Sequence, residues 1–236
     1  MPEWLASPAG QYLCAWERAY LDRAVVDIFG FHALQLGFPM VDALQANRMP
    51  HRWLACDASP EPWPLGREVV LTHYEALPFP DASLDLLVLP HTLELSYDPH
   101  ATLREVERVL VPEGRVVICG FNPNSLWGLS KSCQRGFPQV GDFIGQRRLR
   151  DWLQLLSFEV ESTSFGCYRP AVHSERWLQR MAWLDEAGVR WWPILGAVYG
   201  MVAVKRVHGM RLMSPAWKRA APSRAAVVST ATKGME

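Results

Sequence analysis

The sequence lacks the features that mark disulfide-rich, zinc-binding and membrane-spanning proteins. Its five cysteines are widely spread and form no Cys-x-x-Cys pair, which predicts reduced thiols. The seven histidines lie at no metal-ligand spacing from a cysteine or carboxylate, so we expect no metal site. Residues 1–10 contain no apolar signal segment, and the apolar stretch 191–204 is interrupted by Pro193, Gly196 and Gly200. These absences predict a cytoplasmic protein.

The chain also lacks a net charge, because 24 basic and 24 acidic side chains cancel over its 236 residues. This balance argues against a generally basic nucleic-acid binder, and we expect no stable nucleic-acid partner. The cancellation is uneven, since residues 205–236 carry seven basic side chains and one acidic one. We therefore predict an acidic body, with a pI below the whole-chain value of 7.1, joined to a basic tail.

Three parts of the chain are expected on this basis. Residues 1–30 form an N-terminal helix packed on the domain, 31–210 form the domain, and 211–236 form a basic, disordered tail without hydrophobic periodicity. The tail, with Trp217, is either a solvated end or a weak contact for anionic membrane or RNA. The sequence does not indicate an oligomeric state.

Helical and strand patterns alternate along the domain. Apolar residues three and four apart predict a helix that ends near Gly30, and further helices are expected at 40–47, 149–156 and 175–185. Another helix begins with Asp98 as its cap and Pro99 in its first turn. Short apolar runs predict strands at 32–36, 51–56, 68–72, 85–89, 115–119, 158–165 and 197–206. This alternation favours an α/β fold with a mostly parallel sheet covered on both faces.

Ligands bind such sheets beyond the carboxyl ends of the strands. Gly37 follows the first strand, where it lets the chain turn tightly or lets a ligand approach the backbone. Asp57 follows the second strand, where a carboxylate either binds ribose hydroxyls or caps a turn. Spacing alone leaves both alternatives open for each residue.

The segment 75–122 is more specific. It contains EALPFPDASLDLLVLPHTLEL, then Asp98-Pro99 before a helix, then RVLVPEGRVVI, in that order. These motifs closely resemble class I S-adenosylmethionine-dependent methyltransferases of the type 11, small-molecule kind. The resemblance is good over about 32–122 and implies a Rossmann-like seven-stranded sheet, S-adenosylmethionine as cofactor and a small-molecule acceptor.

The resemblance also implies site residues. Gln35 and Gly37 lie in the place of the family's glycine-rich first motif, although Gln35 replaces an acidic residue and Pro39 replaces the second glycine. Asp57 lies in the place of the ribose ligand. The segment beside the adenine and the segment near the methyl group correspond to His73, Tyr74, Glu75, Ala76, Leu77, Pro90 and Leu93.

Methyl transfer from a sulfonium to a hydroxyl or amine also needs a base. His91, which follows the fourth strand, is the candidate catalytic residue, and its alternative role is structural. Four residues either line an acceptor pocket or have only structural roles: Tyr97, Asn122, Tyr168 and His173. Trp127 and 191–193 either cover an apolar acceptor or belong to ordinary core and lid packing. The altered first motif keeps a second function open, that of a non-catalytic protein on the same fold that binds a cofactor or a partner. A nicotinamide dehydrogenase fits less well, because no Gly-x-Gly-x-x-Gly follows the first strand.

Overall fold

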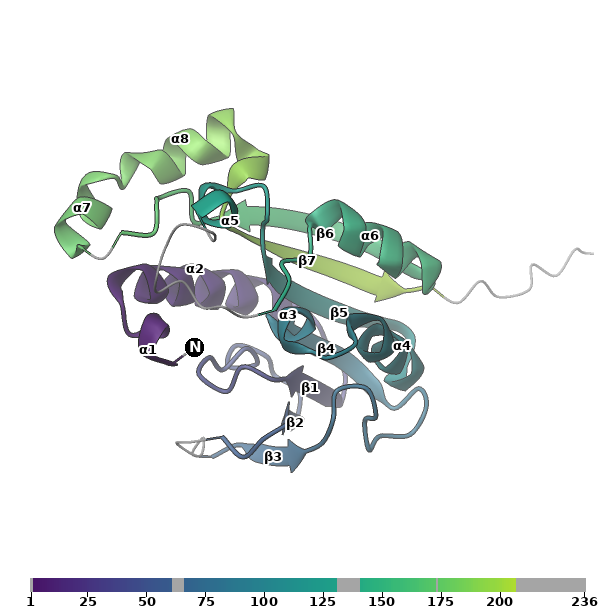
Figure 1. Ribbon diagram of the computed structural model, residues 1–236. Helices are drawn as coiled ribbons and strands as arrows, with labels where there is room; N and C mark the ends of the chain where they lie inside the picture. The colour runs from purple at the N-terminus through teal and green to yellow at the C-terminus, as the bar shows by residue number, and fades with distance from the viewer. Residues whose placement is uncertain (1, 61–65, 131–140, 173, 207–236) are drawn as a thin grey trace, which may run out of the picture.

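The computed structural model describes residues 2–60, 66–130, 141–172 and 174–206. These residues contain a seven-stranded sheet of order β3-β2-β1-β4-β5-β7-β6 (Figure 1). Its strands are β1 (His32–Leu36), β2 (His51–Cys56), β3 (Glu68–Leu71), β4 (Leu84–Pro90), β5 (Leu110–Phe121), β6 (Phe158–Gly166) and β7 (Val198–Lys205). The strands from β3 through β5 are parallel, and β7 is antiparallel to both of its neighbours. The predicted Rossmann-like, mostly parallel sheet is confirmed.

Helices cover both faces of this sheet. The described helices are α1 (Pro2–Leu5), α2 (Pro8–Val25), α3 (Thr92–Leu95), α4 (Pro99–Val109), α5 (Leu126–Ser130), α6 (Gln146–Leu155), α7 (Glu175–Arg180), α8 (Trp183–Trp191) and the 3-10 turn η1 (Pro193–Leu195). Helix α2 lies on one face, and α4 and α6 lie on the other (Figure 1). Because both faces are covered, central strands such as β4 are buried along almost their whole length.

Side-chain caps set where the two longest amphipathic helices begin. The Ser7 hydroxyl accepts a hydrogen bond from the Gly10 amide at 3.2 Å at the start of α2. The Asp98 carboxylate accepts from the amides of His100 and Ala101 at 2.9 and 3.0 Å at the start of α4. Each cap satisfies amides that a first helical turn leaves unpaired, so the cap predicted at Asp98 is confirmed.

The helix predicted at 40–47 is wrong, because side chains hold this segment as turns. The Gln35 amide nitrogen donates to the carbonyls of Gly37, Phe38 and Val41, and its oxygen accepts from the Ala43 amide. Carbonyls bound in this way are not available to a helical ladder.

The helix predicted at 175–185 is instead two helices, and the second continues to Trp191. The guanidinium of Arg169 donates to the Leu178 carbonyl at 3.3 Å and to the Asp185 carboxylate at 2.9 Å, which fastens the break between α7 and α8. The short helices α1, α3 and α5 were not predicted.

The carboxyl ends of the parallel strands lie at the same edge of the sheet as the start of β7 and the end of β6. β7 begins opposite the end of β5, since Val198 pairs with Phe121, and β6 ends there too, since Gly166 also pairs with Val198. The connection between β6 and β7 therefore leaves the sheet at the edge where ligands bind this fold. The predicted tail, 211–236, lies outside the described residues. In the described ranges, no helix has both the length and the apolar character needed to cross a bilayer.

Candidate functional site

A cavity of about 500 Å³ lies at the carboxyl ends of β1 and β2. Its walls come from the loop after β1, the loop after β2, the turn after β3 and the end of α3. The lining residues are Phe38, Pro39, Met40, Cys56, Asp57, Ala58, Ser59, Pro60, Tyr74 and Leu95. The volume is in the range of small-molecule and cofactor sites.

Two predicted residues, Asp57 and Tyr74, line this cavity, and Gly37 directly precedes the lining residue Phe38. Gly37 has φ +68°, and a Cβ at this position would lie 2.8 Å from the hydroxyl of Tyr74. That hydroxyl donates to the exposed carboxylate of Asp57 at 3.4 Å. Burial, and then the nearby Asp57 charge, raise the pKa of Tyr74 well above its ordinary value, so the phenol stays neutral. Gly37 therefore lets the Tyr74 hydroxyl lie close to the backbone, and a residue with a Cβ would prevent this contact.

The fourth predicted residue of this region, Gln35, is fully buried and has a bracing role. Its side chain makes the four bonds to the loop after β1 described above, and its oxygen also accepts from the Arg67 guanidinium at 2.6 Å. Both the nitrogen and the oxygen of the Gln35 side-chain amide are therefore hydrogen-bonded within the protein. The first motif is held by a side-chain brace where the family has an acidic residue.

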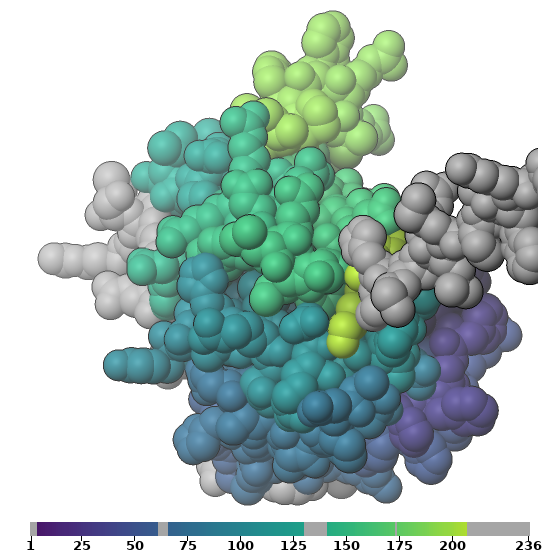
Figure 2. Space-filling view, turned by 90° about the vertical axis from the view of Figure 1, so that its right-hand side faces the viewer, coloured from purple at the N-terminus to yellow at the C-terminus, as the bar shows by residue number. Residues whose placement is uncertain are grey.

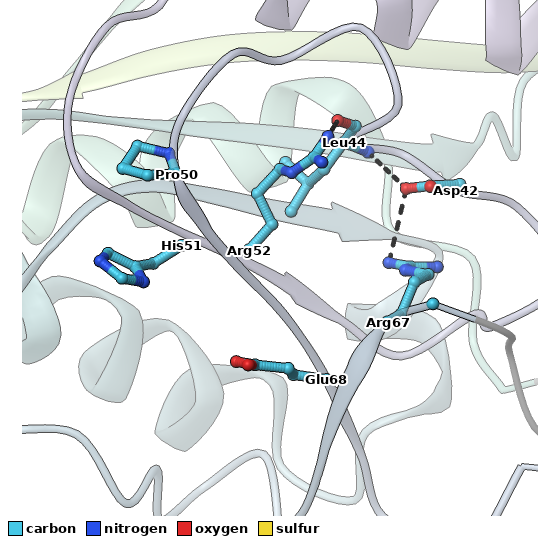
Figure 3. A pocket seen from close by; sticks show the side chains of 8 residues that line it. Asp42, Leu44, Pro50, His51, Arg52, Arg67 and Glu68 are labelled. Carbon is cyan, nitrogen blue, oxygen red and sulfur yellow. Dashed lines mark hydrogen bonds and ion pairs between the residues drawn. The ribbon is translucent and has the colours of Figure 1, made fainter.

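A second, polar cavity of about 270 Å³ adjoins the same loop (Figure 3). Arg67, on its wall, binds Gln35 and lies 3.6 Å from the carboxylate of Asp42. Arg52 donates to the carbonyls of Leu44 and Asn47 at 3.2 and 3.3 Å. Both guanidinium groups are therefore occupied in supporting the loop after β1.

The remaining residues of the predicted cofactor site lie around the cavity without lining it. His73 and Ala76 are exposed on the turn after β3, and the Glu75 carboxylate accepts from the Ser96 hydroxyl at 2.8 Å. The other three, Leu77, Pro90 and Leu93, are buried. Their contacts with a cofactor stay predictions.

His91 lies in the left-handed region, at φ 55°, between β4 and α3, and its side chain is completely buried. Its Nε2 contacts the carboxylate of Glu17 from α2, and its Nδ1 lies 2.8 Å from that of Glu94. Glu94 in turn accepts from the Phe121 amide at 2.5 Å. This triad of Glu17, His91 and Glu94 ties α2 to the ends of β4 and β5.

The triad holds a charged histidine. Burial lowers the pKa of His91, but the carboxylates of Glu17 and Glu94 more than offset this and raise it to about 10. Burial also raises the pKa of Glu94. An imidazolium with both nitrogens directed at carboxylates offers no free nitrogen to an acceptor. The geometry therefore favours the structural alternative for His91 over a catalytic base.

Aromatic rings surround His91 at the same edge of the sheet. The Phe121 and Phe38 rings lie 4.2 and 5.6 Å from the His91 ring, measured between centroids. Phe143 stacks on Phe121 at 5.0 Å, and Trp4 of α1 contacts Phe121 edge-on at 6.4 Å. We call Trp4, Phe38, Phe121 and Phe143 the aromatic cluster. Phe38 belongs both to this cluster and to the wall of the 500 Å³ cavity.

The predicted acceptor contacts are dispersed. Tyr97 is fully exposed, whereas the buried Asn122 donates to the carbonyls of Ile194 and Gly196 at 2.8 and 2.9 Å. The Tyr168 hydroxyl donates to the Pro193 carbonyl at 2.7 Å. His173 lies outside the described residues. Asn122 and Tyr168 therefore hold the η1 turn.

The predicted apolar cover is also divided. Trp127 is buried and donates from its ring nitrogen to the Arg169 carbonyl at 2.7 Å, whereas Trp191 and Trp192 are exposed. Sequence reasoning missed Phe38, and its only signal was its position directly after Gly37. Among the described residues, no group of three or more His, Cys, Asp or Glu side chains is arranged to hold a metal ion.

Comparisons with known proteins identify the family of the chain. The family model described as "Methyltransferase domain" matches residues 37–118. The uncharacterized protein YafS of Escherichia coli is 34% identical over 189 residues, which are 78% of this chain and 72% of YafS. Malonyl-[acyl-carrier protein] O-methyltransferase of Halorhodospira halophila is 33% identical over 90 residues, which are 38% of this chain and 29% of that enzyme.

A solved structure extends the agreement to the whole sheet. The S-adenosylmethionine-dependent methyltransferase of Archaeoglobus fulgidus superposes with a TM-score of 0.60 and 19% identity, over 81% of this chain and 94% of that chain. The superposition shows that the fold is shared, and the match to the methyltransferase-domain model shows that the chain belongs to the class I, type 11 family of S-adenosylmethionine-dependent methyltransferases.

Proposed function

We propose that the protein transfers the methyl group of S-adenosylmethionine to an apolar small-molecule acceptor. One observation carries the proposal: Phe38 lines the cavity at the ends of β1 and β2, and its ring also lies 5.6 Å from that of His91, against which Phe121 packs at 4.2 Å. A cofactor in that cavity would have an apolar, ring-lined region beside it. Apolar surroundings of this kind select acceptors by burial of apolar surface.

The adenosine half of the cofactor fits the polar side of the cavity. Asp57 presents an exposed carboxylate at the end of β2, where it would accept hydrogen bonds from ribose hydroxyls. Tyr74, held neutral, steers that carboxylate through its hydroxyl. Gly37 lets the Tyr74 hydroxyl lie close to the backbone of the loop after β1, because a Cβ there would lie 2.8 Å from that hydroxyl. We assign adenosine binding to these three residues.

The bound cofactor supplies the activated methyl group, so the chain has to align two reactants and exclude water. Phe38 would form the dry wall beside the acceptor, and the buried Phe121 ring packs against His91 in the same cluster. The His91 imidazolium, held by Glu17 and Glu94, keeps those rings in place and acts as a positioning residue.

Transfer of a labelled methyl group tests the proposal. We would incubate the full chain with methyl-labelled S-adenosylmethionine and a cell extract that has been separated into organic-soluble, aqueous small-molecule and macromolecular fractions. We expect label in the organic-soluble fraction. Asp57→Asn should reduce the transfer at limiting cofactor by roughly tenfold or more, as expected for a lost hydrogen bond to a charged group. Asp151→Asn, an exposed site on α6, is the matched control.

The other outcomes are equally informative. Label confined to the aqueous or macromolecular fraction would contradict the apolar acceptor. Binding of S-adenosylhomocysteine without label in any fraction would favour the non-catalytic alternative. Equal losses in Asp57→Asn and Asp151→Asn would remove Asp57 from the cofactor site.

A further inference from the structure

The connection between β6 and β7 projects from the body of the molecule. It consists of α7, α8 and η1, residues 175–195, which we call the tryptophan arm. The arm extends beyond the sheet and beyond α2 (Figure 1), and its α8 end stands out from the molecular surface (Figure 2). The arm belongs to the same edge of the sheet as the cavity, because it leaves from the end of β6 and returns at the start of β7.

The arm exposes large apolar side chains. The exposed fractions are 58% for Trp177, 62% for Trp183, 69% for Trp191, 54% for Trp192 and 59% for Ile194. Four of the eleven tryptophans of the chain are therefore more than half exposed within this one segment. Large apolar side chains exposed in such density on one segment are typical of an interaction site.

Helix α8 carries two of these tryptophans on one face. Trp183, Ala187 and Trp191 lie four residues apart and share one face of the helix. Gly188, one turn before Trp191, is buried, and a Cβ there would lie 2.3 Å from the Tyr168 ring. The helix therefore packs on the body at this small residue, while Trp183 and Trp191 beside it are exposed.

The exposed charge of the arm is positive. Arg176, Arg180 and Arg190 are exposed, and none forms an ion pair with any residue in the described parts of the chain. The Arg180 guanidinium instead lies 5.6 Å from the Trp177 ring. The Asp185 carboxylate is neutralised by Arg169, which leaves Glu175 and Glu186 as the exposed acids against three arginines.

The arm is held in place from the body. The Tyr12 hydroxyl of α2 bonds the Asp185 carboxylate, and Asn122 at the end of β5 bonds the Ile194 and Gly196 carbonyls. Tyr168 bonds the Pro193 carbonyl. A surface presented by fixed supports loses little conformational entropy on binding.

We propose that the tryptophan arm docks the protein on the surface of an anionic lipid bilayer. Tryptophan rings favour the headgroup region of membranes, and arginines beside them pair with anionic lipid headgroups while their stems contact apolar surface. The arm is a convex projection, which can enter a headgroup layer without a complementary groove. Docking would bring the cavity edge of the sheet close to the bilayer. The proposal does not depend on the methyl acceptor.

Vesicle flotation with the full chain tests the proposal. The vesicles are phosphatidylcholine alone or phosphatidylcholine with phosphatidylglycerol, and we expect much stronger binding to the anionic ones, weakened by salt. The double substitution Trp191→Ser with Trp192→Ser should reduce that binding by roughly tenfold or more, because it removes two apolar side chains from the interface. The matched control is Phe29→Ser with Phe31→Ser, two exposed rings just before β1, at the opposite edge of the sheet.

Replacing Arg176, Arg180 and Arg190 with glutamine should reduce binding to anionic vesicles and remove most of its salt dependence. Binding of S-adenosylhomocysteine in solution should be the same for every variant, which separates this proposal from the catalytic one. The proposal is overturned if the arm variant binds vesicles like the wild type or if both double variants lose binding equally. It is also overturned if the arm variant only converts a dimer into a monomer, since the arm would then be a surface between two copies.

Discussion

Replacing His91 with glutamine would test how the N-terminal helix is fastened to the sheet. The substitution removes the positive charge that lies between Glu17 and Glu94 and leaves two carboxylates in a site with no access to solvent. One oxygen of Glu17 already has no hydrogen-bond partner within the described part of the chain. Removing one partner from a buried ion pair costs about 3–5 kcal/mol of unfolding free energy. Urea denaturation, followed by circular dichroism, measures this loss.

The control for this measurement is His73→Gln, at an exposed histidine on the turn after β3. It should change the free energy of unfolding by less than about 0.5 kcal/mol, as is usual for surface substitutions. A loss below about 1 kcal/mol for His91→Gln would refute the interpretation of the triad as a charged fastening.

The pH dependence gives a second, independent measurement of the same triad. The pKa of His91 is raised to about 10, so the folded protein keeps a proton that the unfolded chain releases above its ordinary value of 6.5. The stabilisation is therefore complete below pH 6.5 and is lost as the pH rises toward 10. Between pH 6.5 and 8 the loss should be roughly 1–2 kcal/mol. His91→Gln should remove this slope, and an unchanged slope would contradict the assignment.

Three further variants test the supports of the site. Gly37→Ala should lower affinity for S-adenosylhomocysteine in calorimetry by roughly tenfold, because a Cβ at φ +68° would lie 2.8 Å from the Tyr74 hydroxyl; an unchanged affinity would exclude Gly37 from the cofactor site. Gln35→Leu should lower the free energy of unfolding, measured by urea denaturation, by about 2–3 kcal/mol, because several buried backbone groups would lose their partner. An unchanged free energy of unfolding would contradict the bracing role. Asn122→Ala should increase hydrogen exchange in η1 and α8 without changing exchange in α4, because the Ile194 and Gly196 carbonyls lose their donor. If hydrogen exchange in η1 is the same in Asn122→Ala and in the wild type, other contacts hold the arm.

Local patterns were sufficient to predict most of the fold. The strands at 32–36 and 51–56 and the cap at Asp98 depend on apolar runs and on a side chain that acts within one turn. The turns at 40–47 were not predictable in this way, because they depend on the buried Gln35 brace. The segment has a helical composition, but tertiary hydrogen bonds override that tendency.

The same distinction applies to the candidate site. Asp57 and Tyr74 lie at strand ends that the sequence marks, and both line the cavity. His91 also follows a strand, but its surroundings include Glu17, which is 74 residues away in the chain. No spacing rule brings that carboxylate to the histidine. Contacts of this range decide whether a titratable residue is exposed to a substrate or is a buried support.

A calorimetric titration of the protein with S-adenosylhomocysteine tests the cofactor site most directly. We expect saturable binding of one molecule per chain, weakened by about 1–3 kcal/mol in Asp57→Asn and unchanged in Asp151→Asn. Absence of binding at millimolar ligand, or equal affinity in the wild type and Asp57→Asn, would contradict the claim that the cavity at the ends of β1 and β2 is the cofactor site.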